Sequence, residues 1–204
     1  AASVVAYPEM TEAVAESRAI ALNGAILQMV NHGLITGGLF FLVGVIYERT
    51  HTRDLKAFGG LSAKLPVYYG VMMVTAFASL GLPGFSGFIA EIMVFLGAFN
   101  SAGINQLLPR GYAMHATLGL LLSAGYYLWT LQRMFLGKFY LRNNQWESVL
   151  KDLNKREYVM FLPLVILVIL FGIFPHLLLN VTNASVNQLV DLINRFGFEN
   201  FRQL

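Results

Sequence analysis

The segment Ala78–Glu91 reads A-S-L-G-L-P-G-F-S-G-F-I-A-E and lies in the middle of the long apolar run Pro66–Phe99. The run is longer than the roughly 20 residues that a helix needs to cross a bilayer, and each half alone is shorter. Glycine and proline weaken helical structure, and they interrupt the run near its centre at Gly81, Pro83, Gly84 and Gly87. We therefore predict one membrane helix that is broken mid-membrane, with Glu91 beside the break.

The composition of the chain is that of an integral membrane protein. Hydrophobic residues make up 56% of the sequence, charged residues only 12%, and the mean hydropathy is +0.60. Cysteine is absent, which excludes thiolate metal sites, Fe–S ligation and disulfides in this chain. The net charge of +3 does not indicate a nucleic-acid partner, because the basic residues cluster beside apolar runs, as they do on the cytoplasmic flanks of membrane spans.

The apolar runs divide the chain into three parts. Residues 1–21 are expected to form an outer-face loop that leads into a helix, and residues 22–180 to form the membrane domain. That domain would contain four transmembrane helices, at about 22–47, 66–99, 112–132 and 158–179. Residues 181–204 place apolar side chains at helical spacing between polar ones, which predicts an amphipathic helix in the membrane interface. The expected fold class is all-α and integral to the membrane.

The distribution of Lys and Arg tests whether 66–99 crosses once or twice. Most of the 14 basic residues lie in the connections that follow the first and third spans. If 66–99 crosses once, both connections face the same side, which the positive-inside rule assigns to the cytoplasm. Two crossings would place them on opposite sides. The single broken crossing is therefore favoured, and it puts both termini on the outer face.

Glu91 is the only Asp, Glu, Lys or Arg within the four predicted spans. Irregular backbone at membrane depth is tolerated only where it is buried in protein or lines a water-filled cavity. An ionisable side chain at such a break is costly and is a functional-site hypothesis by default. We predict that Glu91 exchanges protons. The alternative is a structural carboxylate that is paired with a Lys or Arg of a neighbouring subunit.

A polar stripe runs through the first predicted span. Gln28, His32 and Thr36 recur at intervals of four residues and share one helix face, with Asn31 adjacent. A histidine between polar neighbours can hold ordered water and pass protons near neutral pH. A neutral histidine that is hydrogen-bonded between helices is an equally open interpretation.

Two tyrosines are candidates for the third predicted span. Tyr126 and Tyr127 follow a serine and a glycine in S-A-G-Y-Y-L-W, and either hydroxyl could join a hydrogen-bonded path. Aromatic residues at the membrane interface explain such residues as well. No nucleotide-binding motif occurs in the sequence, and we expect no metal or cofactor to bind this chain.

The joined motifs resemble a known family. Residues 22–54, L-N-G-A-I-L-Q-M-V-N-H-G-L-I-T-G-G-L-F-F-L-V-G-V-I-Y-E-R-T-H-T-R-D, are followed by F-G-G-L and then by the segment that ends at Glu91. Together they are similar to the M-type antiporter-like subunits of respiratory complex I. The likeness is good over about 22–138 and weak at both ends. It implies a segment of a longer subunit built from inverted repeats, each with a broken helix and a proton-handling residue.

On this resemblance, Glu91 corresponds to the carboxylate of the second broken helix, which discharges protons toward the outer face. His32 corresponds to the central histidine of the preceding helix. The implied function is proton translocation in the membrane arm of an NADH–quinone oxidoreductase. Flavin, Fe–S clusters and quinone would be handled by partner subunits. The expected partners are the other membrane-arm subunits, especially neighbouring antiporter-like ones, and the lipid bilayer of an energy-transducing membrane, such as the bacterial inner membrane.

Two other functions stay open on the sequence. One is a subunit of a multi-subunit cation/proton antiporter, which shares the fold of these complex I subunits. The other is a purely structural segment of a membrane arm without a live proton path. The sequence Y-E-R-T-H-T-R-D and Glu91 favour the complex I interpretation.

Overall fold

The computed structural model describes residues 12–103 and 110–201, and this part of the chain is mostly helical, as the sequence predicted. The α-helices are α1 (Glu12–Thr50), α2 (Pro66–Ser79), α3 (Ser86–Gly103), α4 (Arg110–Phe135), α5 (Trp146–Val149), α6 (Lys155–Ile173) and α7 (His176–Phe201). Two short strands, β1 (Phe58–Gly59) and β2 (Tyr140–Leu141), and two 3-10 turns, η1 (Leu55–Ala57) and η2 (Leu61–Ala63), lie in the connections.

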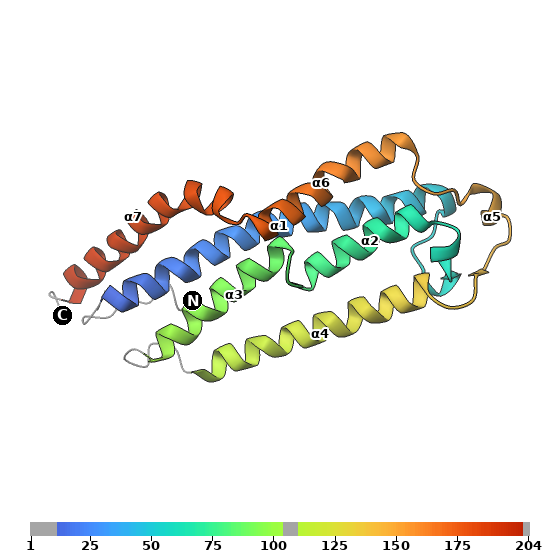
Figure 1. Cartoon of the computed structure of the whole chain (residues 1–204). Helices are drawn as coiled ribbons and strands as arrows, with labels where there is room; N and C mark the ends of the chain where they lie inside the picture. The colour runs from blue at the N-terminus through green and yellow to red at the C-terminus, as the bar shows by residue number, and fades with distance from the viewer. Residues whose placement is uncertain (1–11, 104–109, 202–204) are drawn as a thin grey trace.

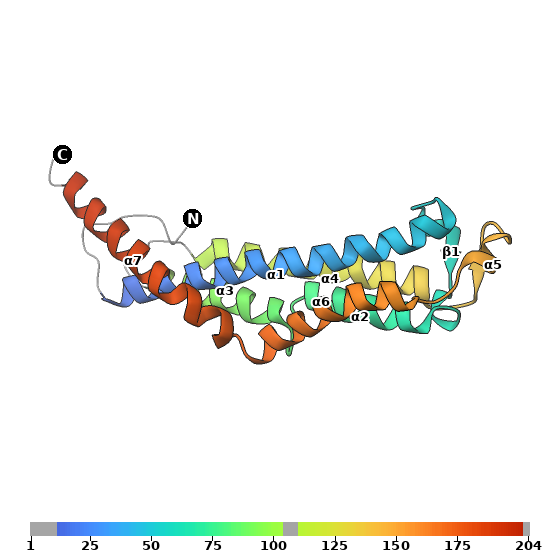
Figure 2. The ribbon, with the colours of Figure 1, turned by 90° about the horizontal axis from the view of Figure 1, so that it is seen from above.

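The long helix α1 is the element along which the others are arranged (Figure 1). Helices α2 and α3 follow one another along α1, with α4 on their far side and α6 beside α1 and α2. Helix α7 leaves the bundle at an angle, as Figure 2 shows. Two helices of the described part are long and apolar enough to cross a membrane, 14–50 and 155–173, and 86–100 is a shorter apolar helix.

Helix α1 begins earlier than the predicted span 22–47. It already starts at Glu12, inside the segment expected to be a loop and lead-in. Two polar residues near the start of α1 have partners on other helices: Ser17 Oγ donates to the Gly97 carbonyl of α3 at 2.7 Å, and Asn23 Oδ1 accepts from Thr182 of α7 at 2.9 Å. Residues 1–11 of the predicted loop lie outside the described residues.

The predicted span 158–179 does not coincide with one helix. Helix α6 ends at Ile173, and the last residues of the expected span belong to α7. The cause is Pro175, because a residue before proline is pushed out of the helical conformation. Phe174 accordingly has φ −122° and ψ 62°. The expected amphipathic helix 181–204 therefore starts earlier, at His176, and residues 202–204 lie outside the described part.

The connections after α1 and α4 pack together at one end of the bundle, and we call 51–65 with 137–154 the loop clasp (Figure 1). Strands β1 and β2 pair antiparallel across it, with Phe58 opposite Leu141. The Asp152 carboxylate accepts from the backbone N–H groups of Val67 and Tyr68 at 2.8 and 2.9 Å. It thereby satisfies two of the free donors at the start of α2, a pairing that the sequence did not predict.

Ion pairs and a buried aromatic core complete this end of the molecule. Ion pairs join Arg142 to Asp54, Lys64 to Glu147 and Arg49 to Glu157. Beneath them, the main apolar cluster includes Leu42, Tyr68, Phe135 and Phe161 from four different helices. The loop clasp, this cluster and the Arg49–Glu157 ion pair together fix the ends of α1, α2, α4 and α6 relative to one another.

Candidate functional site

Residues 80–85 connect α2 to α3, and we call this segment the break. Its backbone is not helical because Gly81 and Gly84 adopt positive φ angles of 65° and 97°, which glycine reaches without steric cost. The Leu80 N–H still bonds to Ala76 O at 3.0 Å, and the Leu82 N–H bonds to Phe77 O at 3.2 Å. The break is therefore a tight turn that closes α2 before α3 begins.

The two helices nearly touch across the break. A Cβ added at Gly87, in the first turn of α3, would lie 2.5 Å from the Ala78 carbonyl oxygen of α2. Only glycine allows this approach, which explains its presence just after the break. Figures 1 and 2 show α3 continuing in roughly the direction of α2, displaced sideways rather than folded back. The interpretation of both helices as a single membrane crossing remains a prediction at this point.

The carboxylate of Glu91 lies against the break. A Cβ added at Gly81 would collide with Glu91 Oε2 and would lie 2.8 Å from its Cδ. The side chain is partly buried, and no hydrogen bond or ion pair reaches its carboxylate from residues 12–103 or 110–201. The structure thus brings together two residues that the sequence singled out, Gly81 and Glu91, through direct packing.

Three other helices contact the break or its two ends. From α1, Asn31 Nδ2 donates to the Ser86 carbonyl at 2.8 Å. From α4, the Tyr127 hydroxyl accepts from Ser79 Oγ at 2.8 Å. From α6, Gly172 is so close that an added Cβ would lie 2.5 Å from the Phe85 carbonyl carbon. Each of these contacts acts on the last residue of α2, the first residue of α3 or the turn between them.

The polar stripe of α1 divides between two directions. Asn31 is fully buried and faces α3, whereas His32 is exposed in this chain. His32 Nδ1 lies 3.3 Å from Thr36 Oγ1, one turn further along the helix. Gln28 is partly buried, and its Oε1 has no hydrogen-bond partner in the described part of the chain. His32 and Thr36 share one face, as their spacing predicted, whereas Asn31 faces α3.

The two predicted tyrosines stack on each other but have different surroundings. Tyr127 bonds to Ser79 at the end of α2, but Tyr126 is 55% exposed and stacks on Tyr127 with ring centroids 4.6 Å apart. Sequence reasoning missed the partners at the break, Ser79, Ser86 and Gly172. The two serines flank the Gly- and Pro-containing segment, and their position at the helix ends was the available signal. Nothing in the sequence marked Gly172.

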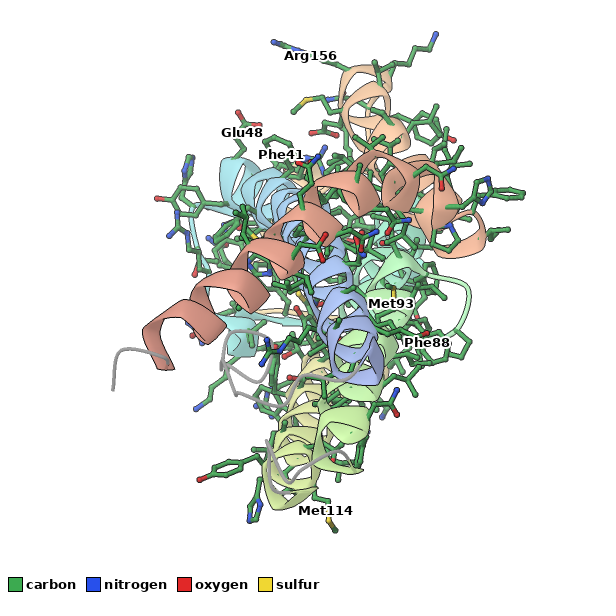
Figure 3. All side chains as sticks on the ribbon, turned by 90° about the vertical axis from the view of Figure 1, so that its left-hand side faces the viewer. Phe41, Glu48, Phe88, Met93, Met114 and Arg156 are labelled. Carbon is green, nitrogen blue, oxygen red and sulfur yellow. The ribbon has the colours of Figure 1, made fainter. Side chains whose placement is uncertain are left out.

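The close packing of α1 on α3 fixes the position of Glu91 along the length of α1. A Cβ added at Gly24 would lie 2.9 Å from Val94 N and 3.0 Å from Ala90 O. Figure 3 shows Met93 beside α1, with Phe88 further from it. Among the described residues there is no group of three or more His, Cys, Asp or Glu that could hold a metal ion. The chemistry that this arrangement can support is proton exchange at one carboxylate.

The described part of the chain packs its helices closely and carries one carboxylate beside the turn between α2 and α3, an arrangement that is compatible with a membrane antiporter-like protein. Comparison with known proteins agrees. Residues 9–112 match the family model described as NADH:quinone oxidoreductase/Mrp antiporter, TM. The chain belongs to this family.

Similar proteins in two organisms bear names that specify the type of subunit. The chain is 40% identical over 169 residues to NADH-quinone oxidoreductase subunit M of Rhodobacter capsulatus, covering 83% of this chain and 31% of that protein. It is 39% identical over 171 residues to NAD(P)H-quinone oxidoreductase chain 4 of the Marchantia polymorpha chloroplast, covering 84% and 34%. The predicted resemblance to M-type subunits is confirmed, and the chain spans about a third of the length of these relatives.

Solved structures show the same fold. A chain of respiratory complex I from Thermus thermophilus superposes with a TM-score of 0.74 at 28% identity, covering 89% of this chain and 37% of that one. A chain of the Mrp complex from Dietzia superposes with a TM-score of 0.67 at 19% identity, covering 85% and 38%. The second likeness concerns the fold alone.

Proposed function

We propose that this chain is part of a proton-translocating subunit in the membrane arm of an NADH–quinone oxidoreductase. The observation that carries the proposal is the contact between the Glu91 carboxylate and Gly81, at the turn where α2 ends and α3 begins. Family membership and the names of the M-type relatives support it. The chain itself would do no redox chemistry. Flavin, Fe–S clusters and quinone would belong to partner subunits, among them neighbouring antiporter-like subunits.

In this proposal, α2 and α3 together form one crossing. At 1.5 Å per residue, the 14 residues of α2 span about 21 Å and the 18 residues of α3 about 27 Å. Each is shorter than the hydrocarbon core of about 30 Å, and the two in succession exceed it. With α1, α4 and α6, the chain would cross the membrane four times. The loop clasp would face the cytoplasm, since the clasp and the helix ends that adjoin it together carry most of the 14 basic residues, and both termini would face outward.

The proposed path uses the polar face of α1 and the carboxylate of α3. His32 and Thr36, which lie within 3.3 Å of each other, would pass protons laterally along the membrane arm, with Gln28 on the same face. Glu91 would accept a proton and release it toward the outer side. Tyr127 and Ser79 would hold the end of α2 in place while this happens.

The test replaces the carboxylate by an amide of the same shape. Glu91→Gln in the native assembly, reconstituted into liposomes, is expected to lower proton pumping at least tenfold relative to quinone reduction. The matched control is Glu48→Gln, because Glu48 is exposed at the end of α1 and lies outside the proposed path. Undiminished pumping by Glu91→Gln would leave only a structural role for this segment.

A cation/proton antiporter is the second candidate, because the matched family includes Mrp antiporters by its description. The two functions differ in their partners. An NADH–quinone oxidoreductase would copurify with subunits that absorb light as flavin and Fe–S proteins do, whereas an antiporter would not. Absorbance spectra of the assembly isolated from its native membrane separate the two.

A further inference from the structure

A groove of about 500 Å³ opens between the end of α1 and the start of α6, and we call it the α1–α6 groove. Its large apolar side chains are Phe40, Phe41 and Val45 from α1, with Met160 and Phe161 from α6. Val45 and Phe161 are buried, whereas the other three are exposed in this chain. The groove therefore has a closed apolar floor and open apolar walls, which is the form of a site for a flexible apolar ligand.

Both walls of the groove change from apolar to charged in the same direction. Phe40 and Glu48 line it about 12 Å apart along the axis of α1, at 1.5 Å per residue. On α6, the charged residue Arg156 comes first and the apolar residue Phe161 follows deeper in the helix. Helices α1 and α6 are also the two in the described part that are long and apolar enough to cross a membrane. The groove thus passes from the apolar part of both helices to their charged ends beside the loop clasp.

Three of the residues that line the groove are charged, Glu48, Arg156 and Glu157. The charge of Glu157 is already paired, because Arg49 Nη2 donates to both of its carboxylate oxygens at 2.7 and 2.8 Å. Glu48 and Arg156 are exposed, and neither forms an ion pair within residues 12–103 and 110–201. Figure 3 shows both side chains projecting from the same side of the bundle, with Phe41 nearby on α1. The rim therefore offers one negative charge on α1 and one positive charge on α6.

We propose that the α1–α6 groove binds a phospholipid whose headgroup carries both a phosphate and an ammonium group, as phosphatidylethanolamine does. Arg156 would bond to the phosphate, since guanidinium groups bind phosphate through charge-assisted hydrogen bonds, and Glu48 would bond to the ammonium group. An acyl chain would lie between Phe41 and Met160. A purely anionic headgroup fits less well, because Glu48 would repel it. The proposal goes beyond the proposed function and needs only that α1 and α6 cross the membrane.

A protein helix is the competing occupant of the groove, because the chain spans about a third of the length of its relatives. Such a helix would enclose Glu48 and Arg156. It would have to supply a base and an acid at matching positions, since a charge that is buried without a partner is costly. A zwitterionic lipid brings both charges in one headgroup, which stays at the membrane surface in contact with water. The two opposite charges on the rim therefore favour the lipid.

The experiment uses the native assembly in vesicles of phosphatidylethanolamine and phosphatidylglycerol in equal amounts. A small fraction of one lipid or the other carries a photoreactive diazirine on its acyl chain, and mass spectrometry locates the labelled peptides after illumination. We expect the phosphatidylethanolamine probe to label residues 40–45 and 160–161 more strongly than the phosphatidylglycerol probe. Arg156→Gln should lower this labelling about threefold, which is the scale of one exposed ion pair. Lys155→Gln is the matched control, because Lys155 is also exposed but does not line the groove.

Two further variants test the charge on α1 and the apolar part of the groove separately. Glu48→Lys would give the rim two positive charges, so labelling by the phosphatidylethanolamine probe should fall and labelling by the phosphatidylglycerol probe should rise. Gly44 lines the groove, and an added Cβ there meets nothing within 4 Å in the described chain. The larger side chain of Gly44→Leu should therefore enter the groove without a clash and lower labelling by both probes.

Two results would overturn the proposal. Equal labelling by the two probes, unaffected by Arg156→Gln, would make the groove ordinary lipid-facing surface without a headgroup site. No labelling of 40–45 by either probe would mean that a protein helix fills the groove. Neither result depends on Glu91: a fully pumping Glu91→Gln variant would refute the proposed function and leave the labelling pattern standing.

Discussion

The loop clasp and the break are both irregular segments at the ends of α2, but they differ in how many of their polar groups are hydrogen-bonded or ion-paired. At the clasp, Asp152 accepts two backbone hydrogen bonds from the start of α2, and ion pairs link the connections. At the break, the Glu91 carboxylate contacts Gly81, and no residue of 12–103 or 110–201 gives it a hydrogen bond or an ion pair. A fully paired region is rigid, whereas a region with unpaired buried groups has less to lose when it changes shape. The contrast identifies the break, rather than the clasp, as the end of α2 where a change of shape would disrupt fewer ion pairs.

The largest effect is expected where α6 presses on the break. In Gly172→Ala, the new Cβ would meet the backbone of Phe85 at 2.5–2.6 Å. Backbone atoms cannot rotate away, so the substitution should cost about 1–3 kcal/mol, as overpacking does. Incorporation of the subunit into the assembly, followed on native gels, should fall. Gly70→Ala is the control, because an added Cβ there meets nothing within 4 Å in the described chain. Equal incorporation of both variants would contradict the contact.

A pair of glycine variants separates backbone strain from contact with the carboxylate. Gly81 and Gly84 both have positive φ, so alanine at either position costs roughly 1–2 kcal/mol. Only at Gly81 would the Cβ also displace the Glu91 carboxylate; at Gly84 it meets nothing within 4 Å. Pumping by reconstituted assemblies should therefore fall several-fold in Gly81→Ala and stay near normal in Gly84→Ala. Equal losses in the two would mean that strain alone matters.

A smaller effect is expected at the clasp. Asp152→Ala removes the acceptor for two N–H groups at the start of α2, which should cost about 1 kcal/mol, as the loss of a helix cap does. Asp152→Asn keeps one acceptor oxygen and should retain part of that stability. Thermal unfolding of the solubilised assembly measures both variants. Proton pumping per quinone reduced should be unchanged, since the clasp lies at the far end of α2 from Glu91. A change in that ratio would show that the two regions are coupled.

The smallest effect concerns the pKa of Asp54. This pKa is held below its usual value, first by the Lys56 backbone N–H that bonds to the carboxylate and then by the Arg142 side chain. A lowered folded-state pKa contributes stability above the ordinary pKa of aspartate, and this contribution is lost as the pH falls through the lowered value. In Arg142→Gln the loss should begin at a higher pH. Exchange of the Lys56 amide, corrected for its intrinsic pH dependence, follows the titration. An unshifted profile would assign the effect to the backbone hydrogen bond alone.

Sequence patterns predicted the helical class, the interruption near Gly81–Gly87 and the family, because these depend on apolar run length and on local Gly and Pro chemistry. They could not predict contacts between distant segments. Asp152 accepts hydrogen bonds from the start of α2, and Gly172 packs against the break. Both contacts join residues that are far apart in the sequence, so no local pattern predicts them. Periodicity also groups residues by face without saying which neighbour each one meets. Asn31 and His32 are adjacent in sequence, but one faces α3 and the other is exposed.

The same distinction between local patterns and long-range contacts applies to the candidate site. Glu91 stands out in the sequence as the single charge in an apolar run, and its seat on Gly81 follows from the break that the sequence contains. Its roles in proton transfer, and those of His32 and Tyr127, remain predictions. The serines at the ends of α2 and α3 carry no such mark. They became visible only through their partners, Tyr127 and Asn31.

The contact between Gly172 and the break has a mechanical consequence. Gly172 is the penultimate residue of α6, and only Phe174 and Pro175 separate that helix from α7. Pro175 fixes one backbone angle of this short joint, and Thr182 ties the start of α7 to Asn23 of α1. A joint of only two residues gives α6 and α7 little freedom to move independently. A tilt of α7 would therefore displace the end of α6 through the covalent chain, and Gly172 would pass this displacement to the turn between α2 and α3 by direct contact with its backbone.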